Sequence, residues 1–337
     1  MDENDFLPFV NQTIMKQSIF ISVFILLFCG TLQATEGNDR GIPTLLNQPK
    51  TTVTVTEHHI VFTFGPLDLQ TGPNIPMIAN MAKQFFAVPQ DMMVIGFTTL
   101  VFTKEGTPLP RHYLHHLSLL DLDKPSTFCP GAPYLIAGSG MELTQAHFPP
   151  GYGVQLKKGA KLLAIASFYH QVPRVTDVMA TFILDRATPN EVRQPLTAYH
   201  VSVTGNCYQS FAQPTNKETE EGVVLGLGLQ TLSHMIQFPI EGCVKFAYTH
   251  AHDYLALMVL ENKTTQRTLL RTMPQVDQDG FLHGFSDNQV FSDPRGFQIH
   301  RQNVYRMMMV YYRPLQDTTP RFGMASYLLY MTNGSCR

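Results

Sequence analysis

Short apolar runs, separated by breaks rich in glycine and proline, make up most of the chain from residue 51 onward. Thr and Val alternate over 52–56, and β-branched or aromatic residues fill 59–64 and 93–102. A period of two places successive side chains on opposite faces of a strand. Further runs of this kind cover 113–120, 161–170, 196–203, 304–313 and 324–331. The pattern predicts an all-β fold with few helices.

Frequent breaks between these short runs favour β-sandwiches. The segment 106–110 contains Gly and two Pro, and 149–153 reads Pro-Pro-Gly-Tyr-Gly. Around 185–195 the alternation gives way to charged and turn-forming residues before it resumes. We therefore expect two tandem antiparallel β-sandwich domains of jelly-roll-like type with an intervening cleft, the first over 35–188 and the second over 189–337.

Composition narrows the class of partner. The 337 residues carry a formal net charge of −2 and only 15% charged residues, with 23 Gly and 23 Pro. A chain this neutral, with no basic arm, is not expected to bind nucleic acid. Gly226-Leu227-Gly228 lacks the strand-to-helix context of a phosphate-binding loop, so nucleotide binding is not expected either.

The N-terminal segment 1–34 reads as an extension followed by a secretory signal. Lys16 precedes the apolar run 19–29, and small residues follow up to Ala34, where we expect cleavage. The run is too short to span a bilayer. An uncleaved anchor or a lipidated Cys29 is the alternative. The expected destination is the periplasm or the extracellular space, with no membrane contact after cleavage.

Export would place the chain in an oxidising compartment. Cys129, Cys207, Cys243 and Cys336 could then form up to two disulfides, with three possible pairings that the sequence leaves open. No two of them have the close spacing of a thiolate metal site.

The most informative motif is Phe-Ala-Tyr-Thr-His-Ala-His at 246–252, together with the later Phe-Gly-Met at 322–324. On a strand, His250 and His252 leave the same face and can converge on one ion. Adding the thioether of Met324 favours copper, because thioethers are good ligands for Cu(I) and poor ones for most other first-row ions. The alternative is two surface histidines and a core methionine.

A second candidate set lies in the first half, at His115, His116 and His170. Neighbours on a regular strand point in opposite directions, so His115 and His116 can share an ion only at a bulge, at a strand end or through different ring nitrogens. The alternative is a structural or surface pair. His112 is a competing ligand, and the pair His58-His59 is expected to lie on the surface.

The order of these motifs resembles the copper type II, ascorbate-dependent monooxygenases, the family of peptidylglycine alpha-hydroxylating and dopamine beta-monooxygenases. That family has a His-His pair, a Pro-x-Gly-x-Gly turn and a third His in its first domain, then a His-x-His and a Met in its second. The resemblance covers about residues 80–331. The matching residues here are His115, His116, 149–153, His170, His250, His252 and Met324.

The resemblance implies two copper ions, with dioxygen and a reductant such as ascorbate hydroxylating a C–H bond. It assigns electron storage to the ion at His115, His116 and His170. It assigns oxygen chemistry beside the substrate to the ion at His250, His252 and Met324, which are the implied catalytic residues.

Two departures from the family bear on the substrate. Tyr248 stands where the peptide enzymes have an Arg, and Ser326 and Leu328 stand where they have Asn and Tyr. Those residues hold a peptide carboxylate in the family, and a buried carboxylate needs such partners. Glycine-extended peptides are therefore not the expected substrate, and the substrate and its chemical class stay open.

Two other classes compete with this interpretation. One is a non-catalytic copper-binding or interaction protein on the same two-domain fold. The other is a metal-independent hydrolase, which would need paired carboxylates, but Asp121 and Asp123 lie in a polar stretch and read as solvated charge. The run Met307-Met308-Met309 suggests copper trafficking, yet on a strand it alternates faces and is expected to be packing.

Overall fold

We describe the fold from a computed structural model of the chain. The structure describes residues 50–72, 77–129, 131–169, 172–202, 218–219, 222–276, 282–285, 290–316 and 322–336. They belong to one compact unit, Gln48–Arg337. The expected signal segment, His170 and Cys207 lie outside the described residues. Within the described ranges, no helix has the length and apolar character needed to cross a membrane.

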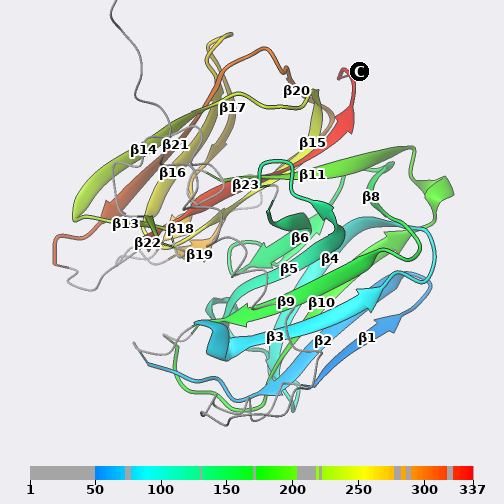
Figure 1. Cartoon of the computed structure of the whole chain (residues 1–337). Coiled ribbons are helices and arrows are strands. Elements are labelled where there is room, and N and C mark those ends of the chain that lie inside the picture. The colour runs from blue at the N-terminus through cyan, green and yellow to red at the C-terminus, as the bar shows by residue number, and fades with distance from the viewer. Residues whose placement is uncertain are drawn as a thin grey trace, which may run out of the picture. The chain divides into compact units, whose positions relative to one another are not determined.

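A ten-stranded sheet runs through both halves of the described chain (Figure 1). Its strands follow the order β1 (Thr51–Val55), β2 (His59–Leu67), β10 (Val178–Ala187), β4 (Met92–Thr103), β8 (Tyr152–Leu156), β11 (Gln194–Ser202), β23 (Ala325–Asn333), β15 (Gly242–Ala251) and β20 (Phe291–Ile299), with β7 (Gln145–His147) paired to β4. Its pairings are antiparallel except for β11 with β8, which is parallel and joins the two halves.

Two four-stranded antiparallel sheets complete the main layers. One has the order β3 (Met81–Ala87), β9 (Lys161–Phe168), β5 (Leu114–Pro125), β6 (Pro133–Gly140), and the other β14 (Gly228–Ile236), β21 (Tyr305–Arg313), β16 (Leu255–Asn262), β17 (Arg267–Thr272). The smaller elements are β12 (Glu218–Thr219), β13 (Gly222–Val224), β22 (Phe322–Gly323), β18 (Gln275–Val276), β19 (Leu282–Gly284) and the 3-10 turns η1 (Met77–Asn80), η2 (Arg111–Tyr113) and η3 (Pro189–Glu191).

The all-β expectation is confirmed, with several antiparallel sheets and only short 3-10 turns among the described residues. The apolar runs predicted as strands correspond closely to β1, β2, β4, β5, β9, β11, β21 and β23. The charged stretch at 185–195 covers the end of β10, a short connection through η3 and the start of β11. The division into separate domains at residue 188 stays a prediction.

Two hydrophobic cores fill the space between the sheets. In the first core, Phe62 and Phe182 of the large sheet pack in one cluster with Leu117 of β5. In the second core, Tyr327 of the large sheet packs in one cluster with Met307 of β21. Each core is thus closed on one side by the same ten-stranded sheet.

Strand β23 contributes to both cores. Leu328 and Tyr330 belong to the first cluster, whereas Tyr327 and Leu329 belong to the second. Residues 325–332 are all buried, because side chains on both faces of the strand are covered. This explains the nearly continuous apolar run at the end of the sequence.

Tyrosine hydroxyls secure the edge strand β6 against the second half of the chain. The Tyr248 hydroxyl donates to the Gly138 carbonyl oxygen at 2.5 Å and accepts from the Gly138 amide at 3.0 Å. The Tyr330 hydroxyl donates to the carbonyl oxygen of Ile136 at 3.0 Å. An uncovered strand edge leaves unpaired backbone groups, and these hydroxyls satisfy them.

The structure contains disulfides among the cysteines for which the sequence allowed them. Cys243 and Cys336 are disulfide-bonded, which ties β15 to the segment after β23, and Cys129 is also disulfide-bonded. The pairing of Cys243 with Cys336 settles one choice that the sequence left open.

The structure confirms the expectation for the methionine run and contradicts the one for Asp121. Met307 and Met309 are fully buried and Met308 is half-buried, so the methionine run is packing, as predicted. The interpretation of Asp121 as solvated charge is wrong. Asp121 lies within β5, is 2% exposed and pairs with the Lys124 ammonium at 2.9 Å.

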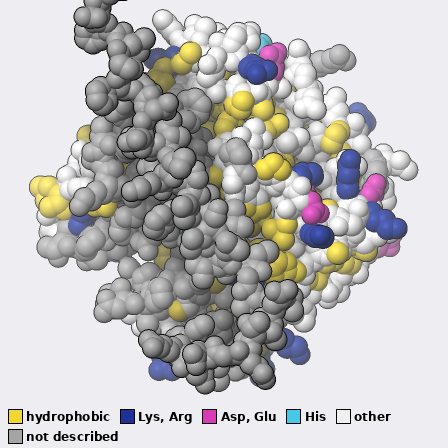
Figure 2. All heavy atoms as spheres, in the orientation of Figure 1, with side chains coloured by type: hydrophobic (Ala, Val, Ile, Leu, Met, Phe, Trp, Pro, Cys, Tyr) yellow, Lys and Arg dark blue, Asp and Glu magenta, His cyan; other side chains and the backbone are white. Residues whose placement is uncertain are grey.

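On the described part of the face in Figure 2, basic and acidic side chains lie interspersed.

Removing the Tyr248 hydroxyl should destabilise the fold. In Tyr248→Phe the amide and carbonyl of Gly138 lose their buried partner, so we expect the free energy of unfolding to fall by about 1–3 kcal/mol. Urea unfolding of this variant and of the exposed control Tyr312→Phe would measure the effect. Equal stability of the two variants would show that the edge of β6 needs no such partner.

Candidate metal centre

Strand β5 brings His115 and His116 together through a bulge. Leu114 pairs with Phe168 and His116 with Ser167, so His115 is the extra residue of the bulged strand. A bulge re-aims side chains that would otherwise alternate. The two ring centroids lie 3.7 Å apart. A bulge is one of the conditions under which His115 and His116 can share an ion, and the structure has one at this position.

His250 lies near the C-terminal end of β15, and His252 follows directly after the strand. Across from them, His250 is opposite Ser326 on β23, and the His252 amide donates to the Met324 carbonyl oxygen at 2.9 Å. This register places Met324 opposite His252. Residues directly opposite each other in an antiparallel pair project to the same face. Met324 itself is half-buried and lies directly before β23.

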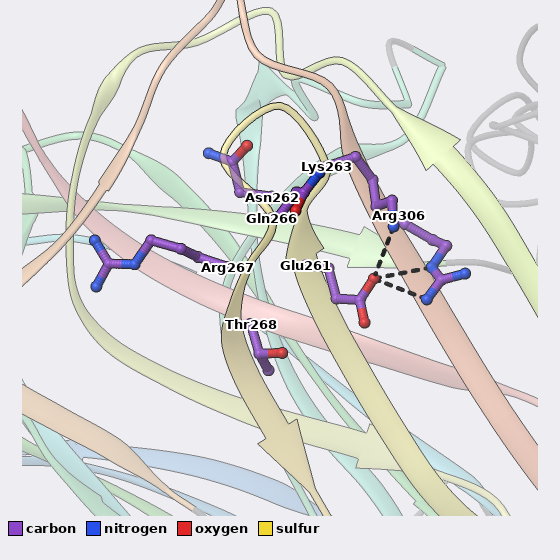
Figure 3. A pocket seen from close by; sticks show the side chains of 7 residues that line it. All are labelled: Glu261, Asn262, Lys263, Gln266, Arg267, Thr268 and Arg306. Atoms are coloured by element: carbon purple, nitrogen blue, oxygen red, sulfur yellow. Dashed lines mark hydrogen bonds and ion pairs between the residues drawn. The ribbon is translucent and has the colours of Figure 1, made fainter.

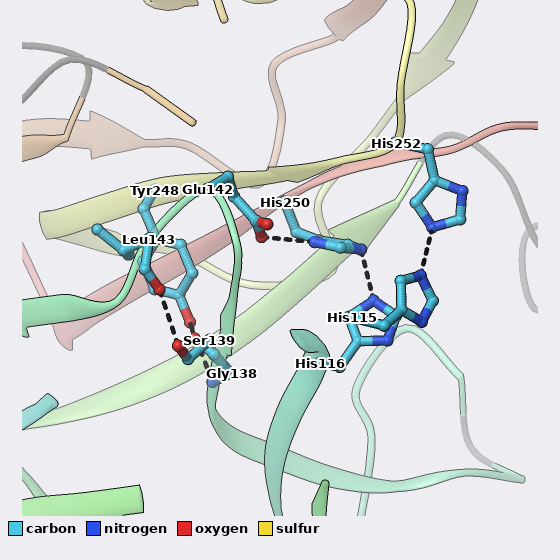
Figure 4. A network of polar contacts seen from close by, with 9 residues as sticks. All are labelled: His115, His116, Gly138, Ser139, Glu142, Leu143, Tyr248, His250 and His252. Atoms are coloured by element: carbon cyan, nitrogen blue, oxygen red, sulfur yellow. Dashed lines mark hydrogen bonds and ion pairs between the residues drawn. The ribbon is translucent and has the colours of Figure 1, made fainter. Parts of the chain in front are cut away.

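The two histidine pairs meet in one cluster between the halves of the chain (Figure 4). The Nε2 atoms of His115 and His252 lie 3.3 Å apart, and those of His116 and His250 lie 2.7 Å apart. His115 is buried and the other three rings are half-buried. Four of the six predicted ligands, which come from positions more than 130 residues apart in the chain, thus lie together.

The spacing of the nitrogens fits a metal ion. His115, His116 and His252 each offer a ring nitrogen, and the three nitrogens lie within 4.8 Å of one another. Tetrahedral ligands about 2.0 Å from an ion lie about 3.3 Å apart, which is the distance between His115 and His252. The 2.7 Å between His116 and His250 is a hydrogen-bond length, in which one ring is the donor. This cluster could hold a metal ion.

A carboxylate from the first half of the chain contacts His250. Glu142 follows β6, and its Oε1 lies 2.6 Å from Nδ1 of His250, with the two side chains 3% and 12% exposed. This is the second contact of His250, on the opposite ring nitrogen from His116 (Figure 4).

Burial holds the nearby imidazoles in their neutral form. Loss of hydration, followed by the charges of the neighbouring histidines, lowers the pKa of His116 well below its ordinary value. Loss of hydration and the proximity of His250 lower the pKa of His200, on β11, to about 4. The neutral imidazole is the form that binds a metal, so the site does not have to lose protons from these rings at neutral pH.

Other polar groups line the cluster. The Tyr169 ring lies 4.6 Å from the His115 ring, and burial raises the pKa of its hydroxyl well above the usual value. Ser167 and Ser326 are opposite His116 and His250 in their sheets, and their buried hydroxyls have no hydrogen-bond partner within the described part of the chain. Buried hydroxyls of this kind commonly bind ordered water.

The remaining predicted residues divide into three groups. His170 lies outside the described residues, directly after Tyr169. The distribution of six ligands over two separate metal pockets stays a prediction. Among the described residues, two imidazoles from each predicted set lie in one cluster. His58 and His59 are exposed, as predicted, and the competing His112 is exposed with its ring stacked on Tyr113.

Sequence reasoning missed Glu142 and His200. Glu142 lies 108 residues from His250 in the chain, and His200 is an isolated histidine in an apolar strand. Neither has a spacing that points to a metal. Only the tertiary structure brings them near the cluster: the Glu142 side chain reaches His250 from the segment after β6, and β11 lies across β23 from β15.

Tyr248 and Ser326 are two of the residues at which the sequence departs from the peptide enzymes. Here the Tyr248 hydroxyl binds the backbone of Gly138, and Ser326 is fully buried. Neither supplies a cation. The structure thus provides no positive charge at these two positions for a peptide carboxylate.

A separate surface pocket of about 250 Å³ lies beside the turn between β16 and β17 (Figure 3). The Glu261 carboxylate in this pocket pairs with the Arg306 guanidinium at 2.8 Å and with the Lys263 ammonium at 3.6 Å. The pocket contains none of the predicted ligands.

Comparison with known proteins gives remote structural likenesses. No family model and no curated protein matches the chain. Among solved structures, N-glycanase F of Flavobacterium meningosepticum is similar over 83% of this chain and 97% of its own, with 12% identity and TM-scores of 0.40 and 0.38 in two structures. The major capsid protein P2 of bacteriophage PM2 covers 80% of this chain and 97% of its own, with 10% identity and a TM-score of 0.33.

Binding of a divalent metal should stabilise the protein through the cluster. At a free Cu(II) concentration of about 100 times Kd, the expected gain in unfolding free energy is about 2.7 kcal/mol. His252→Ala should lose most of this gain, whereas the exposed control His58→Ala should keep it. Thermal melts with and without metal would measure both. A gain that survives His252→Ala and His115→Ala would place the metal elsewhere.

The low pKa of His200 predicts acid sensitivity of the protein without added metal. Unfolded chains bind a proton at His200 near pH 6.5, whereas the folded protein does so only near pH 4. The stability linked to His200 should therefore fall as the pH drops from about 6.5 to about 4. Urea midpoints across this range should depend less on pH in His200→Gln than in the wild type or in His58→Gln. An unchanged pH dependence would contradict it.

Proposed function

We propose that this protein is an exported copper-dependent monooxygenase that hydroxylates a C–H bond with dioxygen and a reductant such as ascorbate. The observation that supports this most is the convergence of His115, His116, His250 and His252, with their nitrogens at hydrogen-bond or ligand spacing. In the reaction, C–H becomes C–OH, the second oxygen atom leaves as water, and the reductant supplies two electrons.

The donor set supports copper over zinc. Imidazole suits both oxidation states of copper, and Met324 lies opposite His252 in the backbone, where its thioether would complete the set with His250 and His252. As the resemblance implies, His115, His116 and His170 would hold one ion and His250, His252 and Met324 the other. Bound copper would supply one-electron transfer and the activation of dioxygen.

The protein's own residues would hold and shield these ions. Burial keeps His116 neutral and available as a ligand. The bulge at His115 and the end of β15 orient the rings from opposite sides of the cluster. Dioxygen and substrate would reach the cluster beside His250 and His252, which are only partly buried. The substrate is not expected to carry an ionised carboxylate to the position of Tyr248.

The finer architecture belongs to the same proposal. Two jelly-roll-like β-sandwiches, each built on one hydrophobic core, would face each other across a cleft that contains the histidine cluster. Export is supported by the disulfide between Cys243 and Cys336, since disulfides persist mainly in oxidising compartments.

A non-catalytic copper-binding protein is the second candidate. The observation that favours it is the use of Tyr248 as a structural group, which removes the substrate anchor of the resembled peptide enzymes. Such a protein would bind Cu(I) tightly and would not consume oxygen.

Copper content and oxygen uptake test the proposal together. Reconstituted protein should hold about two coppers per chain and consume oxygen with ascorbate and a suitable substrate. His250→Ala and Met324→Ile should each lose copper and activity. Met235→Ile, at a 48% exposed methionine, is the matched control and should behave as the wild type.

The possible results separate the two candidates. Copper binding that depends on His250, without oxygen uptake across a broad panel of substrates, would favour the binding protein. Reconstituted protein without stoichiometric copper would exclude both.

A further inference from the structure

We infer that Glu142 is a positioning residue for the metal centre, which holds the proton of His250 on Nδ1 and thereby turns Nε2 toward the ion. The inference rests on the proposed metal function. In this inference Glu142 does not bind the metal itself. It belongs to the first half of the chain, whereas the ligand that it orients, His250, belongs to the second.

The contact between Glu142 and His250 is short and largely buried. Glu142 Oε1 lies 2.6 Å from His250 Nδ1, and the Glu142 side chain is 3% exposed. A buried carboxylate is costly unless it is hydrogen-bonded. His250 is its hydrogen-bond partner in the described part of the chain, so the two groups need each other.

The proton position follows from this geometry. A carboxylate accepts, so the His250 nitrogen facing it must donate, and the neutral ring then carries its lone pair on Nε2. That Nε2 is the atom directed at His116 in the cluster. Carboxylates that accept from the far nitrogen of a metal-binding histidine set its tautomer and its orientation.

The local sequence gives the carboxylate its place. Gly140 lies opposite His116 in the sheet, and a Cβ on Gly140 would come within 2.7 Å of Glu142 Oε1. The glycine leaves room for the carboxylate on the face that carries His116. The Ser139 hydroxyl donates to the Leu143 carbonyl oxygen at 2.8 Å, which closes the turn that contains Glu142. A substituent at Gly140 should therefore displace Glu142 without altering any ligand.

The arrangement also couples the two halves. His250 belongs to β15, whereas Glu142 follows β6, so the ligand of the second half is oriented by a loop of the first. The metal centre should thus depend on docking between the halves as well as on its ligands.

The first test needs no metal. Long-range proton–nitrogen NMR spectra of the protein without added metal should show His250 protonated on Nδ1 in the wild type. In Glu142→Ala that preference should weaken or reverse, and in Glu142→Gln, whose amide oxygen can still accept, it should be largely kept. An unchanged His250 tautomer in Glu142→Ala would overturn the inference.

The second test measures the consequence for copper. We expect about a 10–100-fold weaker Cu(II) affinity in Glu142→Ala, with altered hyperfine splitting in its electron paramagnetic resonance spectrum. Glu142→Gln should lose less. Gly140→Ala should resemble Glu142→Ala. Glu241→Ala, at an exposed carboxylate near His300, is the matched control and should keep wild-type affinity and spectrum.

The outcomes distinguish this inference from the proposed function. Wild-type copper affinity and spectrum in folded Glu142→Ala, together with loss of copper in His250→Ala, would reject the positioning role and leave the metal centre intact. Failure of the wild type to bind copper would reject the metal function, and the NMR result would still decide whether Glu142 sets the tautomer. If Glu142→Ala does not fold, Glu142→Gln and Gly140→Ala decide the same question.

Discussion

The antiparallel pairing of β15 with β23 is the constraint on which the rest of the structure depends. It lies in the middle of the second half, with β11 on one side and β20 on the other. One face of this pair closes the second core, and the other face packs on the first. Because both faces are buried, a shift of one residue in register would exchange the two sets of side chains and destroy both cores. The same register sets His250 opposite Ser326.

The candidate metal centre lies where the end of β15 approaches the bulge of β5. The first core holds β5 in place, and the bulge turns both His115 and His116 toward the end of β15. Hydrophobic packing on each side thereby brings polar imidazoles together at the interface. The cost of burying them is offset by contacts among the rings and with Glu142. A bound ion would replace the ring-to-ring contacts with ligand bonds.

The hydrophobic pattern was a good guide to the strands and a limited guide to their neighbours. Alternation at 52–56 and the apolar run at 93–102 correspond to β1 and β4, because burial of one or both faces imposes the period of two on the sequence. Asp121 was misjudged because a polar stretch reads as solvated when its partner, here Lys124, is disregarded. The parallel contact of β11 with β8 has no sequence signature, although both strands contribute side chains to the first core.

The sequence by itself determined the all-β class. It also identified the histidines and the methionine that are candidate metal ligands, because strand periodicity and ligand chemistry are local properties. It also stated the condition under which His115 and His116 could act together. Only the tertiary structure decided that the two histidine pairs face each other, that Glu142 contacts His250 and that Tyr248 serves the edge of β6. These contacts join residues more than 100 positions apart. They arise from the packing of sheets around two cores, which no short window of sequence encodes.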